Sequence, residues 1–239
     1  MILQRLSLLF LILFASSLTA QTVGKVTFPL NRVFIVPAGT NALEYATFNS
    51  KIDAGDIVQT RSKSRCEILL DTGETIRLGS NTAFSIEIAD GETRCLLSVG
   101  KVWIDDGVNG GSMRIITPAA EVYTDSAQFR IEALKNGTTE ILVYAGNVDS
   151  RKSLGHAVSI EGLSAKREPV AISADSVITT VTPGQSLSLN KDGQTTIAEF
   201  NVDKDELLDW VSWNRKRERL MSEQRKRDAG KREYRARGN

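Results

Sequence analysis

The chain has 239 residues, of which 41% are hydrophobic and 25% are charged, and its net charge is +1. This composition is typical of one substantial hydrophobic core or two small ones, and it excludes disorder throughout the chain. The two Cys residues and the single His are widely separated, which argues against a metal site. No glycine-rich nucleotide-binding motif precedes a helical segment, so we expect no cofactor.

Residues 1–20 have the pattern of an export signal. Arg5 supplies the positive start, residues 6–14 form an apolar run, and residues 15–20 are mostly small. The apolar run is shorter than the roughly 20 residues that span a bilayer. We expect cleavage near Ala20 or after Ser17 and an exported protein, periplasmic or extracellular. An uncleaved N-terminal membrane anchor is the alternative.

After the signal, short runs with alternating apolar residues predict β-strands. In chain order, these runs cover residues 33–36, 57–60, 66–70, 75–78, 84–88, 94–99, 102–104, 113–116, 121–124, 129–133, 140–144, 148–150, 170–174, 177–181 and 186–189. Turn-forming pairs such as Asn136-Gly137 and Asp192-Gly193 lie between or beside the runs, as tight hairpins require. We therefore expect an all-β domain over residues 21–200, with stacked antiparallel hairpins in a sandwich-like or solenoid-like arrangement.

Residues 201–239 predict a C-terminal amphipathic α-helix. Asp203 is the expected N-cap, and Glu206 follows at the spacing of a capping box. Trp210, Val211 and Trp213 crowd the first turns. We expect the front of this helix to pack on the β domain, and its rear to be solvated or to bind a partner.

The end of the chain is basic, with eleven Lys and Arg residues against four Asp and Glu residues after Asn214. The candidate contacts for an anionic partner are Arg215, Lys216, Arg217, Arg219, Arg225, Lys226, Arg227, Lys231 and Arg232. Such a run can be a solvated helix face with ion pairs four residues apart. It can also bind phospholipid headgroups, lipopolysaccharide or an acidic protein. Nucleic acid is not expected, because Tyr234 is the only aromatic residue of the cluster.

Cys66 and Cys95 occur in similar strand-like contexts. Neighbouring strands could bring them together, and an oxidising compartment would then allow a disulfide. Two buried thiols that act as small hydrophobic side chains are the alternative.

Asp71 belongs to the sequence Asp-Thr-Gly, which begins the catalytic loop of aspartic proteases. A catalytic role would require a second carboxylate to share its proton, and a chain with one such motif could supply it only as a homodimer. The flanking runs of alternating residues favour a hairpin turn at Asp71 and Gly73 instead. The single histidine, His156, lies in a polar stretch and is interpreted as a surface loop residue.

Five segments together resemble the FecR domain family. They read GDIVQT, SRCEILLDTGETIRLGSNTAFSI, LSVGKVWI, ITP and EILVYAGNV, and the resemblance covers residues 32–150. It implies an extracytoplasmic β-rich domain used for protein contact or signal sensing. The best-known members add a cytoplasmic anti-sigma segment and a transmembrane helix, neither of which we expect here. Residues 126–129, Ser-Ala-Gln-Phe, stand where the family usually has Gly-Thr-x-Phe.

From these observations we expect a non-enzymatic, FecR-type interaction or sensing module of the cell envelope, with an envelope protein as partner. The alternatives are a homodimeric, retropepsin-like aspartic protease that uses Asp71, and a carbohydrate-binding β domain. The sequence leaves the oligomeric state open.

Overall fold

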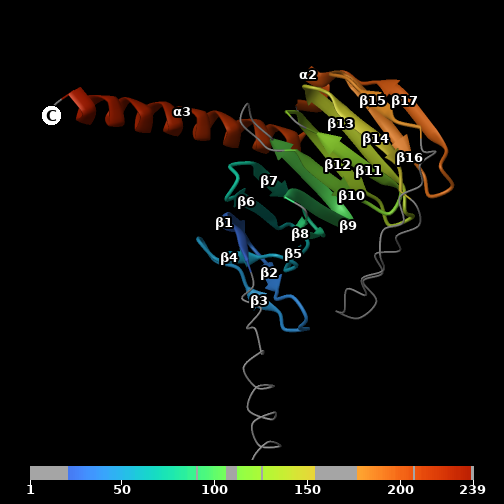
Figure 1. The fold of residues 1–239 in the computed structure, drawn as a ribbon. Coiled ribbons are helices and arrows are strands. Elements are labelled where there is room, and N and C mark those ends of the chain that lie inside the picture. The colour runs from blue at the N-terminus through green and yellow to red at the C-terminus, as the bar shows by residue number, and fades with distance from the viewer. Residues whose placement is uncertain are drawn as a thin grey trace, which may run out of the picture.

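Two β-sheets packed face to face form the main body of the protein (Figure 1). The computed structural model describes residues 21–89, 91–105, 112–124, 126–153, 177–206 and 208–237. All strand pairs among these residues are antiparallel except that between β9 and β10. The prediction of an all-β fold with stacked antiparallel hairpins is confirmed.

Each sheet contains nine strands among the described residues, given below in spatial order. Sheet A contains β4 (Lys51–Asp53), β1 (Thr22–Leu30), β6 (Arg65–Leu70), β7 (Thr75–Leu78), the second part of β9 (Glu92–Asp105), β12 (Gln128–Ala133), β13 (Thr139–Ala145), β16 (Gln185–Leu189) and β17 (Thr195–Glu199). Sheet B contains β3 (Glu44–Tyr45), β2 (Val33–Val36), β5 (Ile57–Thr60), β8 (Ala83–Ala89), the first part of β9, β10 (Met113–Ile116), β11 (Ala120–Thr124), β14 (Val148–Lys152) and β15 (Thr179–Val181).

Successive strand pairs alternate between the sheets. The pairs β6–β7, β12–β13 and β16–β17 lie in sheet A, whereas β10–β11 and β14–β15 lie in sheet B. The fold therefore combines both expected arrangements, because it is a sandwich whose chain winds from layer to layer like a solenoid.

The hydrophobic core lies between the two sheets and is continuous along the sandwich. Alternate residues of each strand point into it, as the period of two predicts. Fully buried members include Val26, Ile68, Ile76, Ile104, Phe129 and Ile141 of sheet A, and Val33, Val58, Phe84, Leu97, Ile115 and Val122 of sheet B. The residues between them face outward, which places polar and aromatic side chains on the outer faces.

The long strand β9 belongs to both sheets. Its residues 92–99 pair with β8 in sheet B, and its residues 100–105 pair with β12 in sheet A. The change of sheet occurs at Gly100, which has a φ of +99°. A Cβ atom there would lie 2.5 Å from the Cα of Thr82 and 2.8 Å from the carbonyl oxygen of Asn81. Only glycine combines this dihedral angle with so close a backbone approach.

Four strands are not predicted from the sequence, namely β1, β3, β4 and β17, and β9 is predicted as two strands. The pattern of β1 is interrupted by Gly24 and Pro29, and its register with β6 shifts along the strand. In β17 every residue is exposed, so its sequence carries no apolar alternation. The predicted strand 170–174 lies outside the described residues, as do the expected export signal and His156.

Two helices, α2 (Val202–Glu206) and α3 (Asp209–Arg237), follow the last strand in the described part of the chain. Asn201 caps α2, because its side-chain oxygen accepts a hydrogen bond of 2.9 Å from the N–H of Lys204. Asp203, the expected N-cap, instead lies in the first turn. The helix α3 begins against sheet A and then extends away from the sandwich (Figure 1).

We expect the substitution Gly100→Ala to lower the free energy of unfolding by about 3 kcal/mol, from a strained φ together with overpacking against Thr82. Gly73→Ala is the matched control, because Gly73 has a similar φ of +107° but no atom lies within 4 Å of the place that a Cβ would take. It should cost only about 1 kcal/mol. Urea unfolding of both variants measures the difference, and equal losses would contradict the role given to Gly100.

Candidate functional site

A transverse row of side chains crosses the outer face of sheet A beneath α3. Pairing in register aligns Phe28 of β1 with Glu67 of β6, Glu67 with Arg77 of β7, and Arg77 with Trp103 of β9. Because residues paired across strands share a face, all four side chains point away from the core. Glu67, Arg77 and Trp103 are nevertheless fully buried or nearly so, since the helix lies over them.

Aromatic side chains make the first contact between the helix and the sheet. The rings of Trp210 and Trp213 of α3 stack with their centroids 5.4 Å apart. The ring centroid of Trp213 also lies 5.9 Å from that of Phe28. Trp103 packs against Tyr144 at 4.6 Å. Trp210 and Val211 are buried in the same cluster as Trp103 and Tyr144. The expectation that the front of the helix packs on the β domain is confirmed.

A buried ionic network continues the contact one turn further along α3. Arg77 donates to Glu67 at 2.8 Å within the sheet. Arg217 of the helix reaches the same carboxylate with two hydrogen bonds of 2.5 and 3.1 Å. Glu218 accepts from the indole N–H of Trp103 at 2.6 Å and from Arg77 at 3.3 Å. Two arginines and two glutamates therefore balance their charges across the helix–sheet interface.

The environments of the two glutamates shift their pKa values in opposite directions. Burial favours a raised pKa for Glu67, but hydrogen bonds from Arg217 and Arg77 outweigh it, and the pKa falls below the ordinary value of 4.5. Burial, with the nearby Asp105 carboxylate, raises the pKa of Glu218. Glu67 is therefore the charged centre of the network, and Glu218 carries its charge at a cost.

Arginines flank the aromatic cluster on both sides. The guanidinium of Arg65 lies 5.1 Å from the ring of Trp213 and pairs with Asp209 at the start of α3. Arg215 lies over Trp103 and Tyr144 and donates to the side chain of Gln128. Arg215 and Arg217 thus make contacts within the molecule, and their assignment to a surface for an anionic partner stays a prediction.

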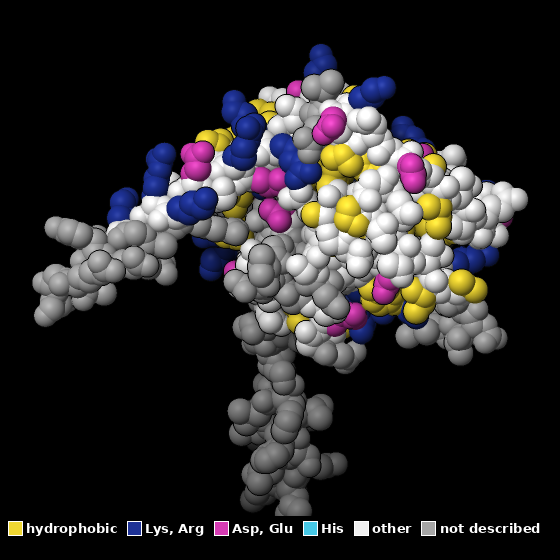
Figure 2. Space-filling model, turned by 90° about the horizontal axis from the view of Figure 1, so that it is seen from above, with side chains coloured by type: hydrophobic (Ala, Val, Ile, Leu, Met, Phe, Trp, Pro, Cys, Tyr) yellow, Lys and Arg dark blue, Asp and Glu magenta, His cyan; other side chains and the backbone are white. Residues whose placement is uncertain are grey.

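The other candidate cations that are described lie on the exposed surface of α3. These are Lys216, Arg219, Lys226, Arg227 and Lys231. Arg227 has an ion pair of 3.9 Å with Glu223, four residues before it. Figure 2 shows blue side chains along the part of α3 that projects from the sandwich. The side chains of Arg225 and Arg232 lie outside the described set. We use the name basic arm for residues 222–237.

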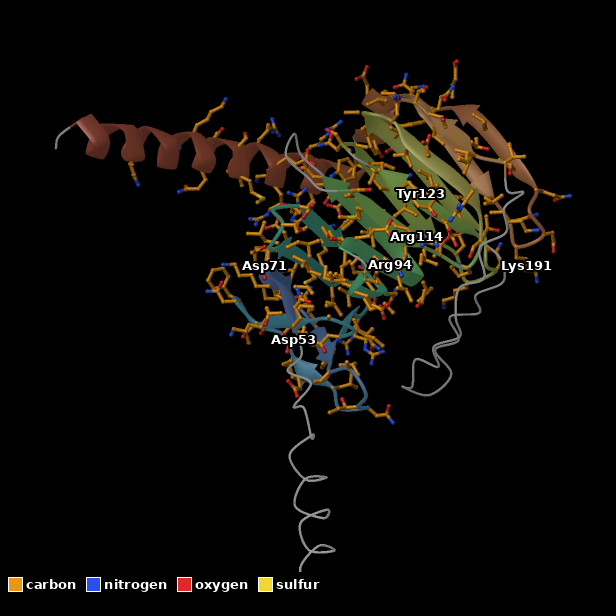
Figure 3. The ribbon with its side chains drawn as sticks, in the orientation of Figure 1. Asp53, Asp71, Arg94, Arg114, Tyr123 and Lys191 are labelled. Carbon is orange, nitrogen blue, oxygen red and sulfur yellow. The ribbon has the colours of Figure 1, made fainter. Side chains whose placement is uncertain are left out.

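A second charged cluster lies on the outer face of sheet B, where Glu121 is 3% exposed. Its carboxylate accepts from Arg114 at 2.8 Å, from Arg151 at 2.7 Å and from the hydroxyl of Tyr123 at 2.9 Å. Both arginines lie within 6 Å of the Tyr123 ring. Burial and the Glu121 carboxylate raise the pKa of Tyr123 to about 12. Arg114 and Tyr123 lie side by side on this sheet in Figure 3.

An exposed aromatic surface marks the end of the sandwich formed by β2 and β3. Tyr45 is 69% exposed, and its ring lies 4.5 Å from that of Phe34. Arg61 lies 5.7 Å from the Phe34 ring on this surface. Phe48, three residues after Tyr45, is also 67% exposed. Aromatic rings with an adjacent arginine are enriched in protein–protein interfaces.

Asp71 occupies the exposed turn between β6 and β7 (Figure 3). Its backbone N–H donates to the carbonyl of Val23 at 3.1 Å, and the N–H of Gly73 donates to Leu70 at 3.0 Å. The two strands that flank this turn pair in register. The hairpin therefore uses Asp71 as a turn residue.

Cys66 and Cys95 are free thiols in the structure, which is the second of the two alternatives left open by the sequence. Cys66 lies in β6 of sheet A and Cys95 in the sheet B part of β9, so the two residues belong to opposite layers. Both are fully buried, and burial raises the pKa of the Cys66 thiol well above its ordinary value. Such thiols pack as small hydrophobic side chains.

Two kinds of site are absent from the described ranges. These ranges hold no group of three or more His, Cys, Asp and Glu side chains arranged to bind a metal. Neither α2 nor α3 has the length and apolar character that a membrane-spanning helix needs.

The sequence patterns did not identify Glu67 as the centre of a buried network. Its signal is Glu67 itself, a charged residue inside the apolar run Arg65–Leu70 of β6. The alternation of inward and outward residues along β6 places Glu67 on the outer face, where a carboxylate is normally hydrated by solvent. Its position under a helix that begins more than 140 residues later depends on long-range folding.

Comparison with known proteins gives one match to a family model and similarities to solved structures. Residues 56–149 match the family model described as FecR protein, which confirms the resemblance recognised in the sequence. Two crystal structures of a “putative anti-sigma factor” from Parabacteroides distasonis ATCC 8503 resemble this fold with a TM-score of 0.46, at 13% and 12% identity. The similarity covers 62% of this chain and 61% of that one. Comparison with curated protein sequences gives no match.

We expect Arg217→Met to lower the free energy of unfolding by about 3 kcal/mol, because it removes one partner of a buried ion pair and leaves Glu67 undercompensated. Arg219→Met, on the exposed side of the same helix, is the control and should change stability by less than about 0.5 kcal/mol. Urea unfolding monitored by tryptophan fluorescence measures both. Indistinguishable variants would mean that the network does not hold α3.

The pKa of Glu67 is lowered by folding, so its stabilising effect is full above the unfolded value of 4.5 and is lost as the pH falls through the lower folded value. The raised pKa of Glu218 acts with the opposite sign, since its contribution is lost as the pH rises. We therefore expect Glu67→Gln to be less stable than the unchanged protein at neutral pH and to lose less stability on acidification below about pH 4.5. Parallel stability curves from pH 7 to about pH 3 would contradict this assignment.

Proposed function

We propose that this chain, which carries a FecR domain over residues 56–149, is a non-enzymatic protein-interaction module of the cell envelope that takes part in signal sensing. The family match supports a regulatory, signal-sensing role. The anchored helix α3 and its basic arm lie outside that match, and these are the parts from which we infer how a partner is contacted.

The observation that carries the proposal is the division of α3 into two halves. Its first turns are held on sheet A by Trp210, Val211 and Arg217. The basic arm contains no Leu, Ile, Val, Met, Phe or Trp, so it has no apolar stripe for packing on a sheet or in a coiled coil. A helix that is anchored at one end and polar all round at the other presents its charges in a fixed direction.

The chemistry of the basic arm favours an acidic protein surface as its partner. Lys226, Arg227 and Lys231 are exposed, and only Glu223 among the described acids of the arm pairs with one of them. Long-range attraction would steer an acidic surface toward the arm. The exposed rings of Tyr45 and Phe48, in and after β3, offer further apolar groups for protein contact.

The export signal supports a periplasmic or extracellular location for this contact, with cleavage near Ala20 or after Ser17. In this proposal residues 1–20 are the signal, residues 21–200 the FecR-like β domain, and residues 201–239 the helical tail. The cysteines do not require an oxidising compartment, because both are buried in the core without a disulfide.

A photo-crosslinking residue at Ser222, the first residue of the basic arm, tests the proposal in the intact cell envelope. We expect Lys226→Glu, Arg227→Glu and Lys231→Glu together to reduce the yield of protein adducts about tenfold, because they reverse the steering charge. Ser222 is exposed, and its hydroxyl contacts only the helix backbone, so the label leaves the anchor of α3 intact.

The matched control reverses three exposed lysines of the sandwich, Lys25, Lys51 and Lys135, and so alters the net charge equally. This control should retain the adducts. Equal losses in both variants, or no loss in the arm variant, would refute a specific contact through the basic arm.

A further inference from the structure

Among the described residues, β17 pairs only with β16, so it forms an edge of sheet A. The other outer strands are short, with two residues in β3 and three each in β4 and β15, whereas β17 has five. Every residue of β17 is exposed, and its sequence, TTIAE, has no Pro or Lys. Its register with β16 is regular and free of bulges. Short length, Lys, Pro and bulges are common protective features of edge strands, and the only charged residue of β17 is Glu199.

The direction of the backbone groups along β17 follows from its hydrogen bonds to the rest of sheet A. Just before β17, the backbone N–H of Asn190 donates to the carbonyl oxygen of Gln194. Just after β17, the backbone N–H of Phe200 donates to the carbonyl oxygen of Gly184. Since bonded and non-bonded pairs alternate in an antiparallel ladder, residues 194, 196, 198 and 200 face β16. The N–H and C=O groups of Thr195, Ile197 and Glu199 therefore point to the open side.

The same three residues place their side chains on the core side of the sheet. Ile197 pairs with Leu187, which is buried in the main core. Ile197 itself is 49% exposed, so the sandwich is open at this edge. A strand added along β17 would satisfy the three free backbone positions and cover this isoleucine.

We propose that the added strand is β17 of a second copy of this chain, paired antiparallel about a two-fold axis at Ile197. In that register Ile197 lies opposite the same residue of the other copy, and Thr195 lies opposite Glu199. In this register the N–H and C=O groups of Thr195, Ile197 and Glu199 in one copy lie opposite those of the same three residues in the other copy. This follows because the three residues are spaced symmetrically about Ile197. A shift by one residue would set outward groups against inward ones.

Charge complementarity favours a second copy over an unrelated peptide. No like charges oppose each other along the strands, since Glu199 faces Thr195. Beyond them, the turn that carries Lys191 would approach Asp203 at the start of α2 in the other copy. Both side chains are exposed, and Lys191 lies at the rim of the sandwich (Figure 3). The turn also contains Asp192, and the ammonium group of Lys152, 3.2 Å from the carbonyl oxygen of Asp192, leaves one net positive charge there.

Site-directed crosslinking of the purified protein tests the register. Ile197→Cys should give a covalent dimer with a short bismaleimide reagent, because the two positions lie about 5.5 Å apart between Cα atoms in such a pair. The native thiols are fully buried and provide a low background. Asn136→Cys, in the exposed turn between β12 and β13, is the control and should give no covalent dimer.

Sedimentation measures the association without a label. Ile197→Pro removes one outward N–H that β16 does not use, so the fold should survive while self-association weakens at least tenfold. Ile197→Val keeps the N–H and most of the side chain, and should retain the dimer. Unchanged circular dichroism and urea unfolding of the proline variant would establish that it is folded.

Three results would overturn the proposal. These are a monomer at all protein concentrations up to about 1 mM, equal association of the proline and valine variants, and equal yields of covalent dimer from Ile197→Cys and Asn136→Cys. None of these results bears on the basic arm, which lies outside the pairing.

Discussion

The contact between α3 and sheet A depends on the buried carboxylate of Glu67. It accepts from Arg77 within the sheet and from Arg217 of the helix, and it is shielded from water by both elements. A buried carboxylate without such partners would be strongly unfavourable, so the helix and the sheet require each other. The aromatic cluster around Trp210 supplies apolar area, whereas the ionic network selects the register of the helix along the sheet. The direction of the basic arm follows from that register.

The sandwich beneath the helix is organised around the crossing of β9. This strand serves sheet B over residues 92–99 and sheet A over residues 100–105, and Gly100 makes the passage possible. Because the same strand stabilises both layers, the hairpins before and after it share one core. A long core of this kind leaves two outer faces, one covered by α3 and the other carrying the Glu121 cluster.

Much of the fold follows from local patterns. Strands with buried inward residues, such as β6 and β12, show clear alternation because one face must be apolar. Prediction fails where burial does not impose a pattern, as in β17, where no residue is buried. The N-cap differs for another reason, since Asn201 and Asp203 are both good caps and only the end of β17 determines which residue begins the helix.

The sequence by itself determined the all-β class, the turn at Asp71, the FecR resemblance and a helix whose first turns are apolar and whose end is basic. These features depend on periodicity and local composition, which act over a few residues. Only the tertiary structure decided that Arg217 binds Glu67, that the two cysteines lie in opposite sheets, and that β17 keeps an open edge. Those outcomes join residues far apart in the chain, and they are settled by which partners become buried together, a property that no local pattern contains.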